Sequence, residues 1–321
     1  MTSFRNEGNV NVDTTLIDFK YEGVAGVGGV YLLEAGKSCL IDSGSTDGAS
    51  HILKTLKKLK KFPPDYIILT HSHWDHSQGI SVLRKNLKSN ERSFEVFASE
   101  KAIPLLEDQS YNTVFKSIKF DNITNVSPLA EGDLIDLEGI TLRIIEVPGH
   151  NTDHIAILDE KNKNLFVGDS IGIKIADDAF LSPIMPPNWN EADYMNTLTK
   201  LQQIDYDSVS LAHYGYIYGE EAKNILEESK KIFMTEKKVF ETAKNVGKLE
   251  DLDYLAKLFL KEMKSTIPNL KLEKVLMRSM LGMINFGRTL LRKEPIAVGQ
   301  ILLKQILEMK VKGYKIAEGL K

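Results

Sequence analysis

The sequence predicts an α/β protein in which two β-sheets pack face to face, with helices on their outer sides and an all-helical C-terminal region. Two observations support this fold class. Short β-rich segments alternate with helical segments in two similar halves that end near residue 216. Beyond that point the apolar residues recur at a 3.6-residue spacing, which is typical of amphipathic helices. Helices outside two stacked sheets bury the apolar face of every element.

The first half contains a hairpin and then alternating helices and strands. β-rich runs at residues 28–36 and 37–44 meet at a Gly-containing turn, which predicts a hairpin. Apolar residues at helical spacing predict a helix over 47–61, which Pro63 and Pro64 terminate. The other predicted segments of this half are strands at 15–21, 65–70 and 94–99, and helices at 79–87 and 101–109.

The second half is a β-rich block that runs from about residue 131 to residue 169. Residues 140–147 form a predicted strand that ends at a Pro-Gly-His triplet. Residues 154–169 read as a hairpin whose polar loop separates two apolar strands. A helix near 192–203 and a last strand at 208–215 complete this half.

The C-terminal region differs in pattern and contains neither histidine nor cysteine. Pro295 stands where a first helical position is expected, ahead of an apolar run. We therefore predict two domains: residues 1–216, which carry the chemistry, and a helical domain at 217–321, which covers the active site. The apolar tail also predicts that two copies of the chain can form a homodimer.

Composition excludes several classes of partner. The chain has 41 basic and 44 acidic residues and a net charge of −3, so no overall field attracts nucleic acid or a membrane surface. No apolar run approaches the ~20 residues of a membrane span, and the polar N-terminus lacks a secretory signal. The single cysteine, Cys39, excludes an internal disulfide. We therefore expect a cytoplasmic protein that acts on a small molecule.

A histidine-rich segment, HSHWDH, follows the predicted strand at 65–70. Residues two apart in an extended chain point the same way, so His71 and His73 can face one point. Asp75 and His76 lie where the chain turns toward the next helix, so they can face a second point nearby. This short segment therefore predicts two adjacent metal positions.

Further ligands are expected at the ends of other strands. His150, Asp169 and His213 each follow a predicted strand directly. Any one of them alone is more often a turn or surface residue, but the joint pattern at strand ends indicates a metal site. With only one cysteine available, the site must be built from histidines and carboxylates, which suit zinc, iron or manganese.

These motifs resemble the metallo-β-lactamase-fold hydrolases, which have an αββα sandwich. The matching segments are LIDSG (40–44), HSHWDH (71–76), PGH (148–150), GD (168–169) and AH (212–213). The resemblance covers residues 10–216 and is specific for fold and metal site but not for substrate. It implies that His71, His73 and His150 hold one ion, that Asp75, His76 and His213 hold the other, and that Asp169 bridges them. The helical tail is similar to the layout of glyoxalase II-like enzymes and of the quinolone-signal response protein.

Two further polar residues are expected to contact the ligands. Asp42 can orient a ligand imidazole through a hydrogen bond, or it is an ordinary turn aspartate at a strand end. His154 is expected beside the ligands rather than on the metal, with a helper role near substrate as the alternative.

A substrate pocket is predicted from apolar residues near the site. The segment 171–195 reads as an apolar loop that lines this pocket, together with a methionine face of the tail; the alternative is an interdomain core. Two tyrosines beside the last ligand can donate to an oxyanion or simply pack. The residues in question are Phe180, Met185, Trp189, Tyr194, Tyr214, Tyr216, Met277, Met280 and Met283.

The resemblance implies hydrolysis of a small thioester, ester or lactone with two divalent ions, zinc being expected first. A hydroxide bridging the ions is the expected nucleophile, Asp75 orients it or carries a proton to the leaving group, and Asp169 holds both ions. Aspartate at position 169 argues against lactamases with a cysteine ligand, and His73 argues against flavo-diiron proteins. Two alternatives stay open: an enzyme similar to the mononuclear iron persulfide dioxygenases, and a regulatory or binding protein that retains the metal site.

Overall fold

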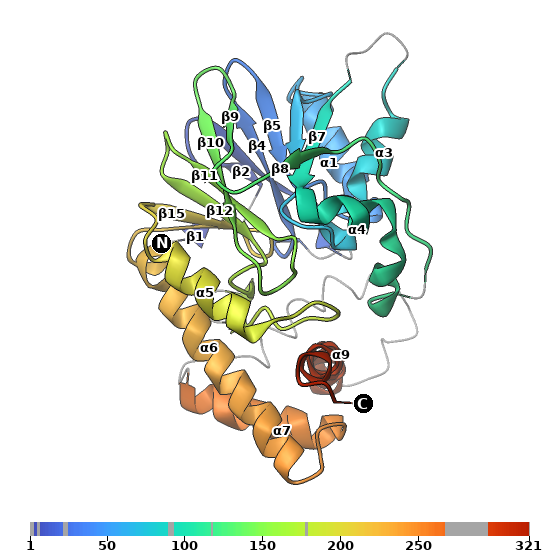
Figure 1. Cartoon of the computed structure of the whole chain (residues 1–321), viewed down its shortest axis with the longest axis vertical. Helices are drawn as coiled ribbons and strands as arrows, with labels where there is room; N and C mark the ends of the chain where they lie inside the picture. The colour runs from blue at the N-terminus through green and yellow to red at the C-terminus, as the bar shows by residue number, and fades with distance from the viewer. Residues whose placement is uncertain are drawn as a thin grey trace.

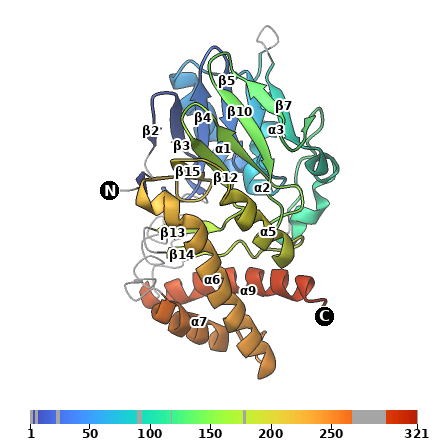
Figure 2. The same ribbon diagram turned by 60° about the vertical axis from the view of Figure 1, so that its left-hand side comes forward.

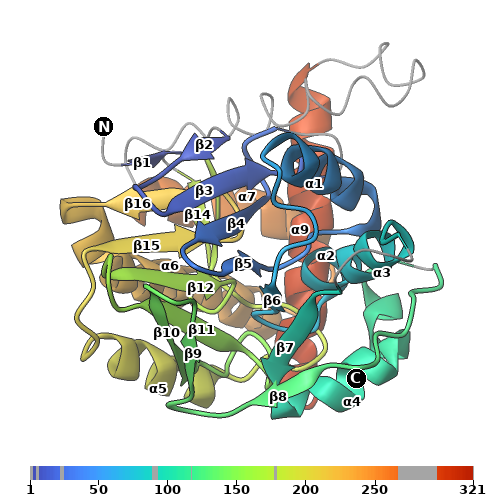
Figure 3. The same ribbon diagram turned by 90° about the horizontal axis from the view of Figure 1, so that it is seen from above.

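The computed structural model describes residues 3–4, 7–21, 25–88, 93–116, 118–176, 179–266 and 295–320. Two seven-stranded sheets pack against each other, and the C-terminal helices gather at one end of this sandwich (Figures 1 and 2). Seen from above, helices flank the sheets on both outer sides (Figure 3). The predicted αββα sandwich with a helical C-terminal extension is confirmed.

The first sheet combines an antiparallel part with a parallel part. Strands β2 to β5 pair antiparallel, and β5 to β8 pair parallel through helical crossovers. The strands are β2 (Gly8–Asn9), β3 (Thr14–Asp18), β4 (Gly29–Glu34), β5 (Ser38–Ile41), β6 (Tyr66–Ile68), β7 (Glu95–Ser99) and β8 (Ser127–Leu129). The helices of this half are α1 (Thr46–Lys58), α2 (Trp74–Ser77), α3 (Gly79–Lys85) and α4 (Ile103–Glu107). The Ser45 side chain caps α1 by accepting a hydrogen bond from the Gly48 N–H at 3.1 Å.

The second sheet is antiparallel except at its centre, where β12 and β15 run parallel. Its order is β1 (Ser3–Phe4), β16 (Tyr216–Tyr218), β15 (Ser208–Leu211), β12 (Asn164–Gly168), β11 (Ile155–Asp159), β10 (Thr141–Glu146) and β9 (Leu134–Asp136). Helix α5 (Glu191–Leu201) supplies the crossover between β12 and β15, and Asn190 caps its first turn. The predicted hairpins at 28–44 and 154–169 are both present.

Alternating side chains build the layers of the core. Along β3 and β4, Leu16, Tyr31 and Leu33 face the second sheet, while Ile17 and Leu32 face the helices outside. This period of two is the reason that one strand can serve two cores. Cys39 is buried between the sheets, and burial raises the pKa of its thiol, so it behaves as a small apolar residue.

Besides the core between the two sheets and the core under the outer helices of the first sheet, a third apolar core lies between the second sheet and the C-terminal helices. These helices are α6 (Glu220–Asn245), α7 (Leu252–Thr266) and α9 (Pro295–Ala317). Helix α9 begins at Pro295, as predicted. This core is continuous from β11 and β12 to α6 and α9, and the proposed domain boundary near residue 216 falls at the start of strand β16. The division into two domains stays a prediction.

The segment 171–195 is not a plain loop, and that prediction was wrong. It contains a two-stranded hairpin of β13 (Ile173–Ala176) and β14 (Ala179–Leu181) before it continues to α5. Ile173 of β13 and Phe180 and Leu181 of β14 pack into the core shared with α6. In the described part of the chain, no helix has the length and apolar character that crossing a membrane requires.

Candidate metal centre

All seven predicted ligands come together at one end of the sandwich. His71, His73, Asp75 and His76 follow β6, and the other three follow β10, β12 and β15. Their nitrogen and oxygen atoms form three buried groups within 4.8 Å: His71/His73/His150, His71/His76/Asp169 and Asp75/His76/His213. Two of these groups match the two predicted ligand sets, and the third connects them through Asp169.

Hydrogen bonds set the orientation of three imidazole rings. The Nδ1 of His76 lies 2.9 Å from Asp42 Oδ2, and the Nδ1 of His150 lies 2.8 Å from the Pro183 carbonyl oxygen. These acceptors require a proton on Nδ1. The Nδ1 of His71 lies 3.1 Å from Thr70 Oγ1, whose own proton goes to Asp42. Each ring therefore turns its Nε2 toward the cluster, and an imidazole nitrogen binds a metal when it carries no proton.

Several buried polar atoms at the centre lack a protein partner. Among the described residues, the Nε2 atoms of His71, His73 and His76 and the Oδ1 of Asp169 have no hydrogen bond. A buried polar atom without a partner costs about 1–3 kcal/mol, so native proteins rarely leave four in one place. Cations bound within these groups would give the four atoms partners, and nitrogen and carboxylate donors suit a divalent metal.

The charge balance of the cluster also fits a cation. Burial lowers the pKa of His71, His73 and His150, so these rings are neutral at pH 7. Burial alone would also lower the pKa of His213, but Asp169 and Asp75 raise it to about 9. His213 Nε2 lies 3.5 Å from an oxygen of each of these carboxylates. The buried carboxylates therefore require positive charge beside them, which divalent ions would supply.

His154 holds the predicted ligand Asp169 and lies outside the three groups of candidate ligands. Its Nε2 accepts the Asp169 N–H at 3.1 Å, and its Nδ1 lies 3.1 Å from the Ile155 carbonyl oxygen. Its ring stacks on His71 with 4.5 Å between centroids. Gly168 makes this possible: its φ is +51°, and a Cβ there would lie 2.7 Å from the His154 ring. His154 thus fixes the Asp169 backbone.

Asp42 contacts the imidazole of the predicted ligand His76 through a hydrogen bond. Besides holding His76, it accepts the Thr70 N–H at 2.7 Å and the Thr70 hydroxyl at 2.9 Å. Asp42 is 3% exposed, and its backbone φ is +63°. One carboxylate thereby orients His76 and, through Thr70, His71.

The structure adds neighbours that the sequence did not indicate. The Tyr21 ring lies 5.2 Å from the His213 ring, and the Phe115 ring lies 4.8 Å from the His73 ring. Tyr111, in a 3₁₀ helix over Gln109–Val114, donates to Ser72 Oγ at 2.6 Å. These residues lie outside the regular strands and α-helices and belong to no recognisable motif. The only feature of the sequence that could have pointed to them is an aromatic residue within a polar segment.

The residues predicted to line a substrate pocket occupy different environments. Phe180, Trp189, Tyr194 and Tyr214 are buried in the core shared with α6 and α9. Two others, Met185 and Tyr216, are half-buried, and Tyr216 stacks on Tyr218. Met277, Met280 and Met283 lie outside the described residues. Substrate contact by this set stays a prediction.

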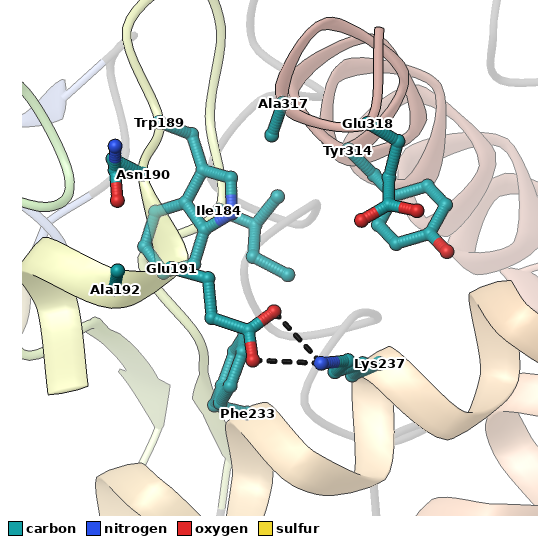
Figure 4. A pocket seen from close by; sticks show the side chains of 10 residues that line it. All are labelled: Ile184, Trp189, Asn190, Glu191, Ala192, Phe233, Lys237, Tyr314, Ala317 and Glu318. Atoms are coloured by element: carbon teal, nitrogen blue, oxygen red, sulfur yellow. Dashed lines mark hydrogen bonds and ion pairs between the residues drawn. The ribbon is translucent and has the colours of Figure 1, made fainter. Parts of the chain in front are cut away.

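One cavity of about 240 Å³ lies where α5, α6 and α9 meet (Figure 4). Aromatic and aliphatic side chains form one part of its wall, and an ion pair of Lys237 with Glu191 at 2.7 Å stands beside them. Its lining residues include Ile184, Trp189, Phe233, Tyr314 and Glu318. The segment that carries Trp189 is tied to the His150 turn, because the Asn190 N–H donates to the Gly149 carbonyl oxygen at 2.9 Å.

Comparison with known proteins finds relatives at low sequence identity. The "Beta-lactamase-like protein 2 homolog" of Caenorhabditis elegans is 25% identical over 189 residues, which are 57% of this chain and 54% of that protein. The "Atrochrysone carboxyl ACP thioesterase" of Aspergillus fumigatus is 27% identical over 143 residues, 44% of this chain and 39% of that protein. The chain thus spans about half the length of the curated relatives it matches, or less.

Solved structures show the same fold at low identity. An archaeal metallo-beta-lactamase superfamily protein from Sulfolobus tokodaii aligns with a TM-score of 0.54 and 21% identity, covering 70% of this chain and 86% of that one. The sequence profile of the Metallo-beta-lactamase superfamily matches residues 24–213, which is more than half of the chain and spans all seven clustered residues. The chain belongs to the metallo-beta-lactamase superfamily.

Proposed function

We propose that this protein is a metal-dependent hydrolase that holds two divalent ions and acts on a small thioester, ester or lactone. The observation that carries the proposal is a set of buried histidine Nε2 atoms without hydrogen-bond partners, whose residues belong to two adjacent groups of candidate ligands. Two groups of three favour two ions over one. Zinc is the first candidate, and iron or manganese suit the same donors.

The residues would divide the work in the following way. His71, His73 and His150 would hold one ion, Asp75, His76 and His213 the other, and Asp169 would contact both. When bound, two such ions would lower the pKa of an attacking water from 15.7 to roughly 7 and would polarise the substrate carbonyl.

Asp75 is the ligand best placed to move a proton. It is 9% exposed, which is more than any of the other six, so it is the most accessible of the seven to solvent. Its Oδ2 lies 3.5 Å from His213 Nε2, which restrains the carboxylate on one side. The other oxygen would orient the attacking water and pass its proton to the leaving group.

The substrate class rests on chemistry and on the relatives. An acyl thioester, ester or lactone offers a carbonyl that activated water can attack without a protein nucleophile. A relative named as a thioesterase is 27% identical to this chain over 143 residues. A cytoplasmic location and homodimer formation remain predictions from the sequence.

The test combines metal content with a substrate panel. Elemental analysis of the purified protein should find two divalent ions per chain. A panel of aryl esters, acyl thioesters and lactones should then reveal hydrolysis that falls at least about a hundredfold in Asp75→Asn. Asp47→Asn, at an exposed position on α1, is the matched control and should keep full activity. One iron per chain with sulfur-dependent oxygen uptake, or full metal loading without any hydrolysis, would contradict the proposal.

A further inference from the structure

We propose that the C-terminal helix α9 positions the metal ligand His150, through a relay that runs from Lys310 to Ser182 and Pro183. The proposal rests on the proposed function in one respect: His150 must hold a metal ion. It assigns a role to a buried charge that lies far from the metal cluster in the sequence and belongs to the helical extension.

Lys310 is a fully buried cation on α9. Its side chain is 0% exposed and pairs with Glu236 of α6 at 2.9 Å, which is also 0% exposed. Its Nζ donates to the Ser182 carbonyl oxygen at 2.6 Å and to Ser182 Oγ at 3.1 Å. All three partners of this ammonium are therefore fixed, and two of them belong to Ser182.

Glu236 holds the remaining polar groups of Ser182. The Ser182 N–H donates to Glu236 Oε1 at 3.0 Å, and the Ser182 hydroxyl donates to Oε2 at 2.5 Å. The N–H, the C=O and the hydroxyl of Ser182 are all bound to this ion pair. Both peptide planes of Ser182 are consequently set by side chains from α6 and α9.

This fixed residue is next to the acceptor that orients His150. The peptide plane with the Ser182 carbonyl also contains the Pro183 nitrogen, and the proline ring restricts φ to about −65°. The Pro183 carbonyl oxygen then lies 2.8 Å from His150 Nδ1. That hydrogen bond keeps the proton on Nδ1 and leaves Nε2 for a metal. Little rotational freedom therefore separates Lys310 from the ring orientation of His150.

A second contact brings α9 against the same segment. A Cβ on Gly313 would lie 2.8 Å from the Met185 carbonyl carbon, so only glycine lets the helix approach this closely. The neighbouring α9 residues Leu307, Val311 and Tyr314 are buried in an apolar core. An apolar pair of the size of Lys310 and Glu236 would stabilise such a core at least as well. Positioning accounts for the buried charges, whereas stability alone does not.

The relay predicts a two-way coupling between α9 and one of the two ions. Among the three ligand groups, His150 belongs only to the one with His71 and His73. Loosening Ser182 should weaken the ion held there and leave the ion held by His76 and His213 unchanged. By thermodynamic reciprocity, metal binding should also stabilise the docking of α9.

The experiment titrates the metal-free full-length protein with zinc against a chelator. The double variant Glu236→Gln/Lys310→Met removes both charges together, which avoids leaving one buried and unpaired. We expect one of the two zinc affinities to fall about tenfold and the other to stay within twofold. Tenfold is the lower end of the loss in metal affinity that follows when a residue that orients a ligand is replaced. Cobalt should show the same split in its ligand-field spectrum. The control is Leu307→Ala, which weakens α9 packing with an apolar side chain that offers Ser182 no hydrogen bond; it should lower Tm but leave both affinities unchanged.

A measurement on the wild-type protein tests the proposal even if the double variant fails to fold. Zinc should slow amide hydrogen exchange in α9, and unchanged exchange would overturn the proposal. Unchanged zinc affinities in the double variant, or an equal loss in Leu307→Ala, would also overturn it while leaving the proposed hydrolase intact. A wild-type protein that binds no zinc, iron or manganese would overturn both.

Discussion

Replacing Asp42 with asparagine should weaken both the fold and the metal site, and the two effects can be measured separately. The Asp42 carboxylate accepts hydrogen bonds from the Thr70 N–H at 2.7 Å, the Thr70 hydroxyl at 2.9 Å and His76 Nδ1 at 2.9 Å. An asparagine side chain has one oxygen and one NH₂ group. Whichever way it turns, the NH₂ must face either the Thr70 N–H or the protonated Nδ1 of His76, so two donors oppose each other.

The magnitude follows from these contacts. A hydrogen bond to a charged group contributes about 1.5–3 kcal/mol, and Asp42→Asn loses one such bond and weakens the others. We expect the free energy of unfolding of the metal-free protein to fall by about 2–3 kcal/mol. Because His76 would lose the acceptor that fixes its tautomer, the zinc affinity of its group should fall about 10- to 100-fold.

Two assays measure these effects separately. Urea denaturation of the chelator-treated protein reports the stability loss, and zinc competition reports the affinity. Asp47→Asn makes the same chemical change at an exposed position in the first turn of α1; it should leave the zinc affinity unchanged and lower the free energy of unfolding by at most about 1 kcal/mol. A zinc affinity within twofold of wild type in Asp42→Asn would refute the reasoning that Asp42 sets the His76 tautomer.

Three further predictions concern the same region. Gly168→Ala should lower the free energy of unfolding by about 1–3 kcal/mol in urea denaturation, because φ is +51° and the new Cβ would meet His154; an unchanged midpoint would contradict this. Chelator treatment should lower Tm, and zinc at about a hundred times its Kd should restore about 2.7 kcal/mol; equal Tm values with and without zinc would argue against a bound metal. Burial raises the pKa of Asp153 to about 6, above its unfolded value of about 3.9. The contribution of Asp153 to the free energy of unfolding is therefore full below pH 4 and is lost as the pH rises to 6. In chelator-treated protein, Asp153→Asn should make the free energy of unfolding fall less steeply between pH 4 and pH 6. If the wild type and the variant lose stability in parallel over this range, the reasoning is wrong.

Local patterns were sufficient to predict most elements. The helix at 47–61 follows from apolar spacing and a proline stop, and the hairpin at 28–44 follows from two β-rich runs around a turn; both depend on neighbours in the chain. The segment 171–195 was misread as a loop because its short strands pair only with each other and rest on α6, a contact that no local pattern encodes.

The candidate site shows the same division. The candidate ligands could be picked out because they lie in short segments that follow strands, and these segments meet at one end of the sandwich. The residues that orient them were visible only in part: Asp42 lies near a motif, whereas Tyr21, Phe115 and the Pro183 carbonyl come from irregular chain or from the backbone itself.

By itself the sequence predicted the αββα class and the seven candidate ligands, because periodicity and position after a strand are local properties, while the division of those ligands between two ions came from the family resemblance. Only the tertiary structure decided which ring nitrogen each histidine presents, that His154 holds Asp169, and that Lys310 of the last helix reaches the segment behind His150. Those contacts join residues that are distant along the chain. Their geometry depends on packing between layers, which no short stretch of sequence contains.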